Sequence, residues 1–411
     1  MVWNEAQWRS SARELEGYLQ PLAAELGRSE RRVAFGQYVT GLLIPGQRKS
    51  ITPMAERLGT ESQGLQQFLT DSPWDEQALW GCLRQEVVGC LGALEYWIID
   101  ETGWVKQGRE SVGVQHQYCG AVGKQANCQI SVQLMFSDGW MCVPVAGRLY
   151  LPQSWCQDRR RRERAKVPAQ IGFATKPAIA LSLIEQALSE GIPKAPVLAD
   201  AVYGHNQAFR AGLRELGFEY ALQANGGQAT GWAKPPGVDA PPASSLASLY
   251  GQWSFQECRW RSVSGQWRHT RLAWNKIWLS SDRPASGQPW PWHWLVVDWP
   301  LAEPEPHQVC LVHLQRPLSK KLALRLSRSR WQVEQSFGRS KDDLGLDHLE
   351  ARSWRAFHHH LVLCAVAYFF VTWMSGRSKK NFQCDLGTGS APDPALAAAI
   401  TRLLSVLSEQ I

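Results

Sequence analysis

The sequence lacks the features that mark secreted, membrane-spanning or zinc-binding chains. Its ten cysteines never lie closer than eight residues apart, so there is no C-x-x-C pair and no zinc-ligand spacing. The N-terminal segment does not have the basic-then-apolar layout of a secretory signal. The longest apolar run, residues 361–374, is too short to span a bilayer and is typical of a buried core helix. We therefore expect a cytoplasmic protein with reduced thiols and no membrane partner.

The sequence has no nucleotide-binding loop of the form G-x-x-x-x-G-K-[ST], which argues against the binding of a nucleoside triphosphate. Its charge is also modest. Charged residues make up 20% of the 411 residues, and the net charge is +7. This balance permits a polyanionic partner without requiring one. The length suits two or three packed units rather than one simple domain.

The first ninety residues are predicted to be helical, because apolar residues recur at three- and four-residue steps. Within residues 51–74, Met54, Leu58, Leu65 and Phe68 would share one apolar face, with Gly59 at a turn. This layout is typical of a helix-turn-helix, which places its second helix in a DNA major groove. A plain helical pair without a role in DNA binding fits the pattern equally well.

Two short apolar runs end in a carboxylate, at Asp100 and at Asp200, and each is predicted to be a buried strand with the acid at its tip. Between them, residues 128–152 read as two paired strands and residues 175–192 as a helix. This order indicates a mixed α/β core. Two acids brought together at strand ends favour Mg²⁺ or Mn²⁺ between them, although a strand-end Asp more often starts a turn or caps a helix.

Residues 231–300 hold ten of the 21 tryptophans in alternating stretches, which predicts a β-rich insertion. Helix returns after it. There Arg330, Glu334 and Lys341 are spaced by four and seven residues, which brings all three to one face of a helix. A carboxylate flanked by two cations can hold a metal beside phosphate oxygens. The simpler alternative is an i,i+4 ion pair between Arg330 and Glu334.

These residues resemble the Tyr-x2-Arg-x3-Glu-x6-Lys signature of DDE transposases from bacterial insertion sequences. The chain has Ser327-x2-Arg330-x3-Glu334-x6-Lys341, with serine in place of tyrosine. Long blocks such as LYLPQSWCQDRRRRERAKVP and RWQVEQSFGRSKDDLGLDHLEARSWRAFHHHL make the chain similar to insertion-sequence family seven-hundred-one, from about residue 30 to 375. It departs from the family at Glu101, where a second aspartate is common, and at Ala201, where an acidic residue is usual.

The resemblance implies an RNase H-like mixed-sheet catalytic core with a β-rich insertion and a helical N-terminal DNA-binding region. The implied division is residues 1–92 for the DNA-binding region, 93–225 and 306–375 for the core, 226–305 for the insertion, and 376–411 for a linker and terminal helix. Asp100, Asp200 and Glu334 would be the catalytic metal ligands for two Mg²⁺ or Mn²⁺ ions.

The implied function is cut-and-paste transposition: binding of terminal inverted repeats, strand cleavage, and strand transfer into target DNA, by a homodimer that associates with the nucleoid. A metal-dependent nuclease without strand transfer, or a catalytically silent DNA-binding descendant, are the alternatives. Further expected DNA contacts are Arg330, Lys341, the basic linker residues Arg159, Arg160, Arg161 and Arg162, and the stacking candidates Trp292, Trp294 and Trp299. His358, His359 and His360 are expected on a polar surface or on phosphate, because consecutive helical residues cannot converge on one ion.

Overall fold

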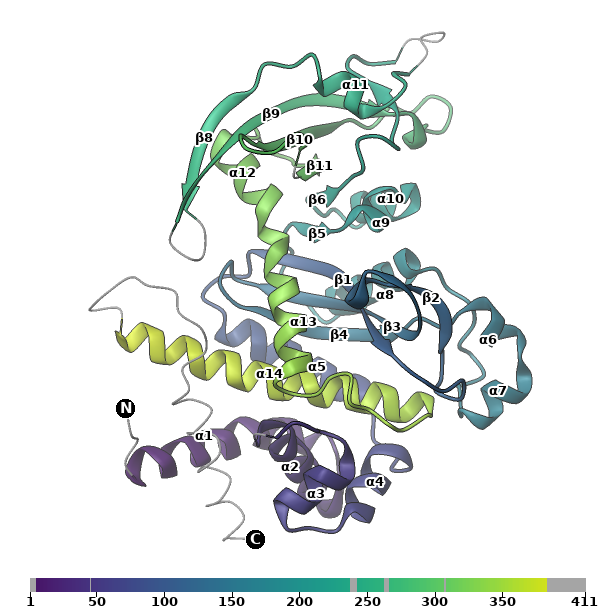
Figure 1. Cartoon of the computed structure of the whole chain (residues 1–411), viewed down its shortest axis with the longest axis vertical. Helices are drawn as coiled ribbons and strands as arrows, with labels where there is room; N and C mark the ends of the chain where they lie inside the picture. Colours follow the sequence, from purple (N-terminus) through teal and green to yellow (C-terminus); the bar gives the residue numbers. More distant parts are fainter. Residues whose placement is uncertain (1–4, 45, 237–241, 262–265, 307, 383–411) are drawn as a thin grey trace.

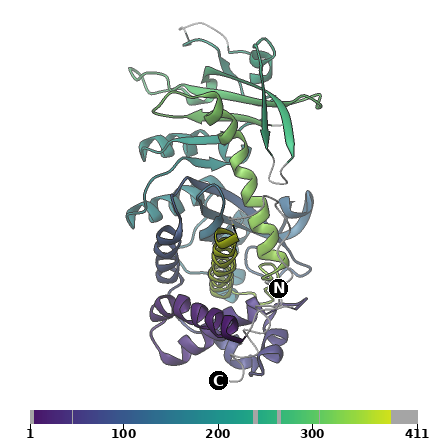
Figure 2. The same ribbon diagram turned by 90° about the vertical axis from the view of Figure 1, so that its left-hand side faces the viewer.

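The computed structural model describes residues 5–44, 46–236, 242–261, 266–306 and 308–382. In Figure 1 they form three tiers, with N-terminal helices at the bottom, a sheet with flanking helices in the middle, and a β-rich tier at the top. A column of helix runs from the upper tier down across the middle one, and Figure 2 shows the same column from the side. The predicted mixed α/β class is confirmed.

The lower tier is helical. Its helices are α1 (Glu5–Ala24), α2 (Ser29–Leu43), α3 (Ile51–Leu58), α4 (Ser62–Thr70) and α5 (Glu76–Cys90). The expected helix pair is α3 and α4, and Gly59 ends α3 with φ 64°, a left-handed conformation that glycine adopts without strain. Met54, Leu65 and Phe68 are buried on the shared face, so the predicted apolar face exists.

The middle tier is a mixed sheet. Its strands are β1 (Tyr96–Val105), β2 (Gln115–Cys119), β3 (Lys124–Ser137), β4 (Cys142–Leu149), β5 (Val197–Ala199) and β6 (Tyr220–Gln223), with the short helix η1 (Gly120–Val122) in the β2–β3 turn. The order is β4-β3-β1-β5-β6, and β2 also pairs with β3. Strands β1, β5 and β6 are parallel, whereas β3 is antiparallel to β1 and β4. This arrangement is consistent with an RNase H-like core.

Helices cover both faces of the sheet. They are α8 (Lys176–Ser189), α9 (Ala201–Gly204), α10 (Gln207–Glu215), α12 (Lys320–Arg328), η3 (Ser329–Trp331), α13 (Gln332–Asp342) and α14 (Trp354–Phe382). Two short helices, α6 (Gln153–Gln157) and α7 (Arg159–Arg164), lie beside the sheet, beyond β2 (Figure 1). Strand side chains alternate between the faces. Trp97 and Ile99 belong to the core beneath α8 and α14, whereas Tyr96 and Ile98 pack with residues of α12 and α13.

The upper tier extends the same sheet rather than forming a separate one. It contains β7 (Gly231–Trp232), α11 (Leu246–Tyr250), β8 (Gln256–Arg261), β9 (Trp267–Leu279), η2 (Ser280–Asp282), β10 (His293–Pro300) and β11 (Gln308–His313). Strand β11 pairs with β6 on one side and with β10 on the other, so the order continues β6-β11-β10-β9-β7. Buried Arg210 of α10 is paired with Asp282 of η2, which fixes the junction.

Helix α14 is the central core helix, as its apolar sequence predicts. By length and composition the stretch Trp354–Ser375 would suffice to cross a membrane, but 83% of its apolar window is buried inside the protein. The expectation for its histidines is wrong, because His358, His359 and His360 are 3%, 0% and 0% exposed. The helix also continues to Phe382, beyond residue 375 where we expected a linker. The expected terminal helix lies outside the described residues.

Candidate active site

Asp100 lies in the middle of β1 rather than at its tip, which corrects the sequence expectation. The strand continues to Val105 because its second half pairs with β3 alone. Pairing of β1 with the parallel strand β5 ends at Ile99, which lies opposite Ala199 and is the residue before Asp100. Alternation places Asp100 on the same face as Ile98, toward α13, in a side chain that is 10% exposed.

Asp200 follows β5 directly and therefore comes next to Asp100 in the parallel register. It also caps the short helix α9, where its Oδ1 accepts the backbone N–H groups of Val202 at 2.9 Å and Tyr203 at 3.4 Å. Asp200 is thus a helix cap, as the simpler alternative expected, and it is also the neighbour of a second carboxylate across the strand pair.

Arg330 joins Asp100 to Glu334. Its Nη1 donates to Asp100 Oδ2 at 2.6 Å, and its Nη2 lies 3.4 Å from Glu334 Oε1. Since one planar guanidinium spans both contacts, these two oxygens lie within about 8 Å of each other. The Glu334 side chain is 60% exposed, so it faces solvent at the mouth of the site whereas Asp100 forms its floor.

Burial raises the pKa of Asp100 to about 7. Arg330 opposes this rise by favouring the carboxylate, and the negative charge of Asp200 adds to it. A buried carboxylate beside a second carboxylate is a position that a cation stabilises, and here the Arg330 guanidinium supplies that positive charge.

The opposite face of β1 carries a second ion pair. Glu101 points toward α8, where its Oε1 accepts from Lys176 Nζ at 2.5 Å, and both side chains are about one-fifth exposed. Burial raises the pKa of Glu101, while Lys176 opposes the rise. Glu101 therefore ties β1 to the first turn of α8 and does not share the face of Asp100.

Lys341 and Ser327 lie apart from the three acids. Lys341 Nζ donates to the carbonyl of Gly103 at 3.0 Å, further along β1, and burial lowers the pKa of Lys341. Ser327 is 3% exposed and bonds the carbonyl of Leu324 and Asp298. The serine that stands in place of the tyrosine is therefore buried and cannot contact phosphate at this position. Trp331, 44% exposed and next to Arg330, is a feature that sequence reasoning missed.

The donor chemistry of the acids fits a hard divalent cation, because all their ligand atoms are carboxylate oxygens. Nevertheless, within the described residues no three His, Cys, Asp or Glu side chains converge closely enough to hold a metal ion. The reason is visible in the contacts, since Arg330 stands between Asp100 and Glu334. Asp100 and Glu334 could share a cation only if Arg330 moved aside.

The tryptophan candidates do not form one surface. Trp292 and Trp294 meet edge to face at 5.6 Å, with Lys276 Nζ 4.2 Å and 5.5 Å from their rings. Trp299 projects from the other side of β10 from Trp294, since five residues separate them along the strand. There its indole N–H donates to Glu303 O at 2.9 Å and its ring packs on Phe255.

The arginine run is helical, not a linker. Asp158 caps α7 by accepting the backbone N–H of Arg161, which allows a short helix despite four consecutive arginines. Arg159 and Arg160 are exposed, whereas Arg162 donates to the carbonyls of Pro168 and Ala169. Arg161 stacks on Trp155 instead of projecting freely.

Two acids thus lie on neighbouring strands of a mixed sheet, with a third on the helix that crosses their face, and comparison with known families gives the class of protein. Residues 21–275, more than half of the chain, match the family described as DDE superfamily endonuclease. The chain belongs to this family. The matched range includes Asp100 and Asp200 and ends before Glu334.

A curated relative narrows the similarity. Over 198 residues the chain is 33% identical to the probable transposase for insertion sequence element IS701 from Microchaete diplosiphon. The aligned part is 47% of this chain and 49% of that protein, so the chain spans about half the length of the relative it matches.

Proposed function

We propose that this chain is a DNA transposase that binds the terminal inverted repeats of an insertion sequence, cleaves its DNA ends and transfers them to target DNA. One observation carries the proposal: Asp100 and Asp200 occupy neighbouring positions of β1 and β5, and Arg330 links Asp100 to Glu334. Membership of the DDE endonuclease family and the similarity to a transposase support it.

In this proposal Asp100, Asp200 and Glu334 hold two Mg²⁺ or Mn²⁺ ions. When bound, such ions activate the attacking hydroxyl and stabilise the leaving oxygen of an in-line displacement. Asp100 provides a fixed ligand because its strand is paired on both sides up to Ile99. Asp200 is held by the backbone N–H groups of α9, which donate to its Oδ1 and orient its carboxylate.

Arg330 has two roles in this scheme. Without metal it is paired with both Asp100 and Glu334, and it offsets part of their negative charge. Once a cation takes that role, the guanidinium is available for the scissile phosphate, whose oxygens match its fork of donors. Lys341 would contact phosphate further along the same face.

The remaining assignments are part of the same proposal. Helices α3 and α4 would read terminal-repeat DNA, the β-rich tier would act as the insertion between the two halves of the catalytic core, and the arginines of α7 would contact backbone phosphates. Trp292 and Trp294 are offered as a stacking pair, and Trp299 as a separate contact. A homodimer that holds two DNA ends on the bacterial nucleoid, in the cytoplasm, completes the proposal.

The test is a cleavage and strand-transfer assay with DNA that carries the flanking inverted repeats, in the presence of Mg²⁺. Asp100→Asn, Asp200→Asn and Glu334→Gln are each expected to abolish cleavage and to leave end binding intact. Asp342→Asn is the matched control, because it removes an exposed carboxylate from the same helix as Glu334. Cleavage retained in one of the three variants removes that residue from the site.

The same assay separates the alternatives. Cleavage without joining of ends identifies a metal-dependent nuclease that does not transfer strands. End binding without any cleavage by the wild-type chain identifies a catalytically silent descendant. Cleavage followed by joining, with both steps lost together in the acidic variants, supports a transposase that uses one site for both reactions.

A further inference from the structure

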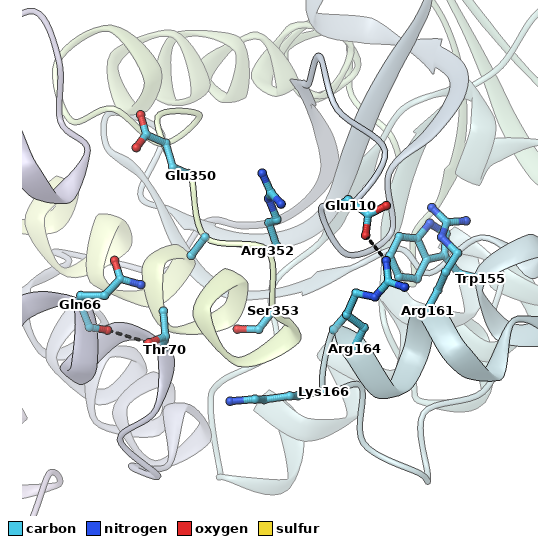
Figure 3. Close-up of a pocket in the computed structure, with 12 residues that line it drawn as sticks. Gln66, Thr70, Glu110, Trp155, Arg161, Arg164, Lys166, Glu350, Arg352 and Ser353 are labelled. Atoms are coloured by element: carbon cyan, nitrogen blue, oxygen red, sulfur yellow. Dashed lines mark hydrogen bonds and ion pairs between the residues drawn. The ribbon is translucent and has the colours of Figure 1, made fainter.

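A groove lies between the lower helices and the core, away from the three acids. It is formed by the end of α4, by α7 with the residue pair after it, and by the segment that leads into α14. The side chains that matter here are Gln66, Thr70, Arg161, Arg164, Lys166 and Arg352. Figure 3 shows these residues facing a common space, with Lys166 reaching beneath Ser353 toward the α4 side. Two segments distant in sequence thus contribute cations to one groove, and the end of α4 adds polar side chains.

Two of these arginines are held in position before any ligand arrives. The Arg161 guanidinium lies 3.8 Å from the centre of the Trp155 ring, and its Nη2 donates to the carbonyl of Arg109 at 3.0 Å. Arg164 is paired with Glu110 at 2.6 Å. Because the side chains are already ordered, little conformational entropy is lost when they bind a further partner.

Lys166 occupies a strained backbone position. Among the described residues it is the one non-glycine residue with a positive φ, at 53°. It ends α7 with hydrogen bonds from its own N–H to Glu163 O and from the Val167 N–H to Arg162 O, a place where glycine is the usual choice. Backbone positions of this kind cluster at functional sites, and here the side chain is an ammonium group that lines the groove.

The acids near the groove do not cancel its charge. Lys166 is paired with Asp71 at 3.1 Å and Arg164 with Glu110, and all four side chains are about half or more exposed. Exposed ion pairs contribute little, so a phosphate can replace the carboxylates at low cost. Glu350 is engaged by Arg48 outside the groove. Within the described part of the chain, the Arg352 guanidinium has no hydrogen bond or ion pair.

We propose that this groove binds the sugar–phosphate backbone of duplex DNA beside the helix pair α3–α4, and so sets how DNA enters the protein; the inference rests on the proposed function. Four cations from two segments suit a run of phosphates better than one compact anion. Cations also continue from the groove toward the acids, since Lys106 Nζ bonds Leu349 O and Lys341 Nζ bonds Gly103 O. Gln66 and Thr70 lie at the end of α4 and line the groove. One DNA duplex can therefore contact both the helix pair and the cations of the groove.

The experiment measures the affinity of the full chain for a short fluorescein-labelled duplex of mixed sequence, by anisotropy, over a series of salt concentrations. Lys166→Gly and Arg352→Gln each remove one proposed phosphate contact. Each contact contributes about 0.9 to the slope of log affinity against log salt, so each variant is expected to lower the slope by about 1 and to weaken binding roughly eightfold at 0.1 M salt. Lys194→Gln is the matched control, since Lys194 is exposed beside the start of β5, at the opposite end of that strand from Asp200.

The glycine substitution makes the outcome specific. Lys166→Gly relieves a left-handed conformation, so its melting temperature should equal or exceed that of the wild type while its DNA affinity falls. A loss of affinity therefore cannot be assigned to misfolding. Wild-type affinity and slope in both groove variants would overturn the proposal. So would equal binding of a polyglutamate peptide with the same dependence on Lys166 and Arg352, because the groove would then serve an acidic protein.

The groove and the catalytic proposal fail separately. Asp100→Asn leaves the groove intact and should keep the wild-type salt slope. If the wild-type chain binds with the expected dependence on the groove but never cleaves, the catalytic proposal falls and the groove stands. If the chain cleaves its ends while both groove variants bind as the wild type does, the groove is wrong and the acidic site stands.

Discussion

Lowering the pH from 7 to 5.5 should destabilise the folded chain through the three buried histidines of α14. Burial lowers the pKa of His358 to about 4, of His359 to about 3 and of His360 to about 4. An unfolded histidine has a pKa near 6.5. Below that value the unfolded chain takes up protons that the folded chain does not bind until about pH 4, so the free energy of unfolding falls as the pH falls.

The size of the effect follows from these shifts. Well below pH 6.5 each histidine lowers the free energy of unfolding by about 1.4 kcal/mol per pH unit. Between pH 7 and 5.5 this amounts to about 1.2 kcal/mol for each histidine, or about 4 kcal/mol for the three. The consequence reaches the active site, because His360 Nε2 lies 3.2 Å from the carbonyls of Gly345 and Leu346, just after the helix that carries Glu334.

The assay is urea unfolding followed by tryptophan fluorescence at both pH values, with His359→Gln as the test variant. Glutamine retains a donor for Leu69 O, which His359 Nδ1 contacts at 2.9 Å, but cannot titrate. The pH-dependent loss of stability should shrink by about 1.2 kcal/mol in this variant. The control His116→Gln removes an exposed imidazole on β2 and should keep the full loss. The reasoning is refuted if His359→Gln and the wild type lose the same stability.

Three further predictions concern single side chains. Arg330→Gln removes the cation shared by Asp100 and Glu334 and should lower the cleavage rate by about a hundredfold. Binding to the DNA ends is measured in the same variant. An unchanged cleavage rate would mean that Arg330 has no role in the reaction. Gly204→Ala would place a methyl group on the carbonyl oxygen of Gln223, so the melting temperature should drop sharply, and a wild-type value would contradict the close approach of α9 to β6. Arg84→Met removes the buried partner of Glu190 and should cost about 3 kcal/mol in urea unfolding, whereas a change below 1 kcal/mol would mean that Glu190 is solvated well enough alone.

The parts of the fold that follow from local patterns could be predicted. Short apolar runs ending in Asp100 and Asp200 indicate buried strands, and Gly59 indicates the turn of the helix pair. The side of β1 on which Asp100 lies, together with Ile98, also follows, because alternation along one strand is a local property. The position of Asp100 within β1 does not, since the second half of that strand is stabilised by β3, and pairing with a distant segment has no local signal.

Long-range packing explains the other differences. Nothing local in residues 226–313 says whether their strands form a separate sheet or extend the core, because this depends on β11 meeting β6. In the sequence the three histidines of α14 resemble a polar patch, yet each is buried against a hydrogen-bond partner from another segment. Tyr38, for example, is the partner of His360. The run of arginines in α7 is predicted to be a linker, but it forms a helix that Asp158 caps. The position of Arg352 in the groove could not be predicted, because folding brings this residue together with α7.

The most direct test of the acidic site needs no DNA. With Fe²⁺ in place of Mg²⁺, together with ascorbate and peroxide, hydroxyl radicals formed at the bound ion cut the nearby polypeptide, and the fragments map the ligands. We predict cuts near Asp100, Asp200 and Glu334 in the same chain, lost together in Asp100→Asn and competed by Mg²⁺. Cuts near Asp100 and Asp200 that never extend to Glu334, or no cuts at any of the three, would contradict a shared metal site.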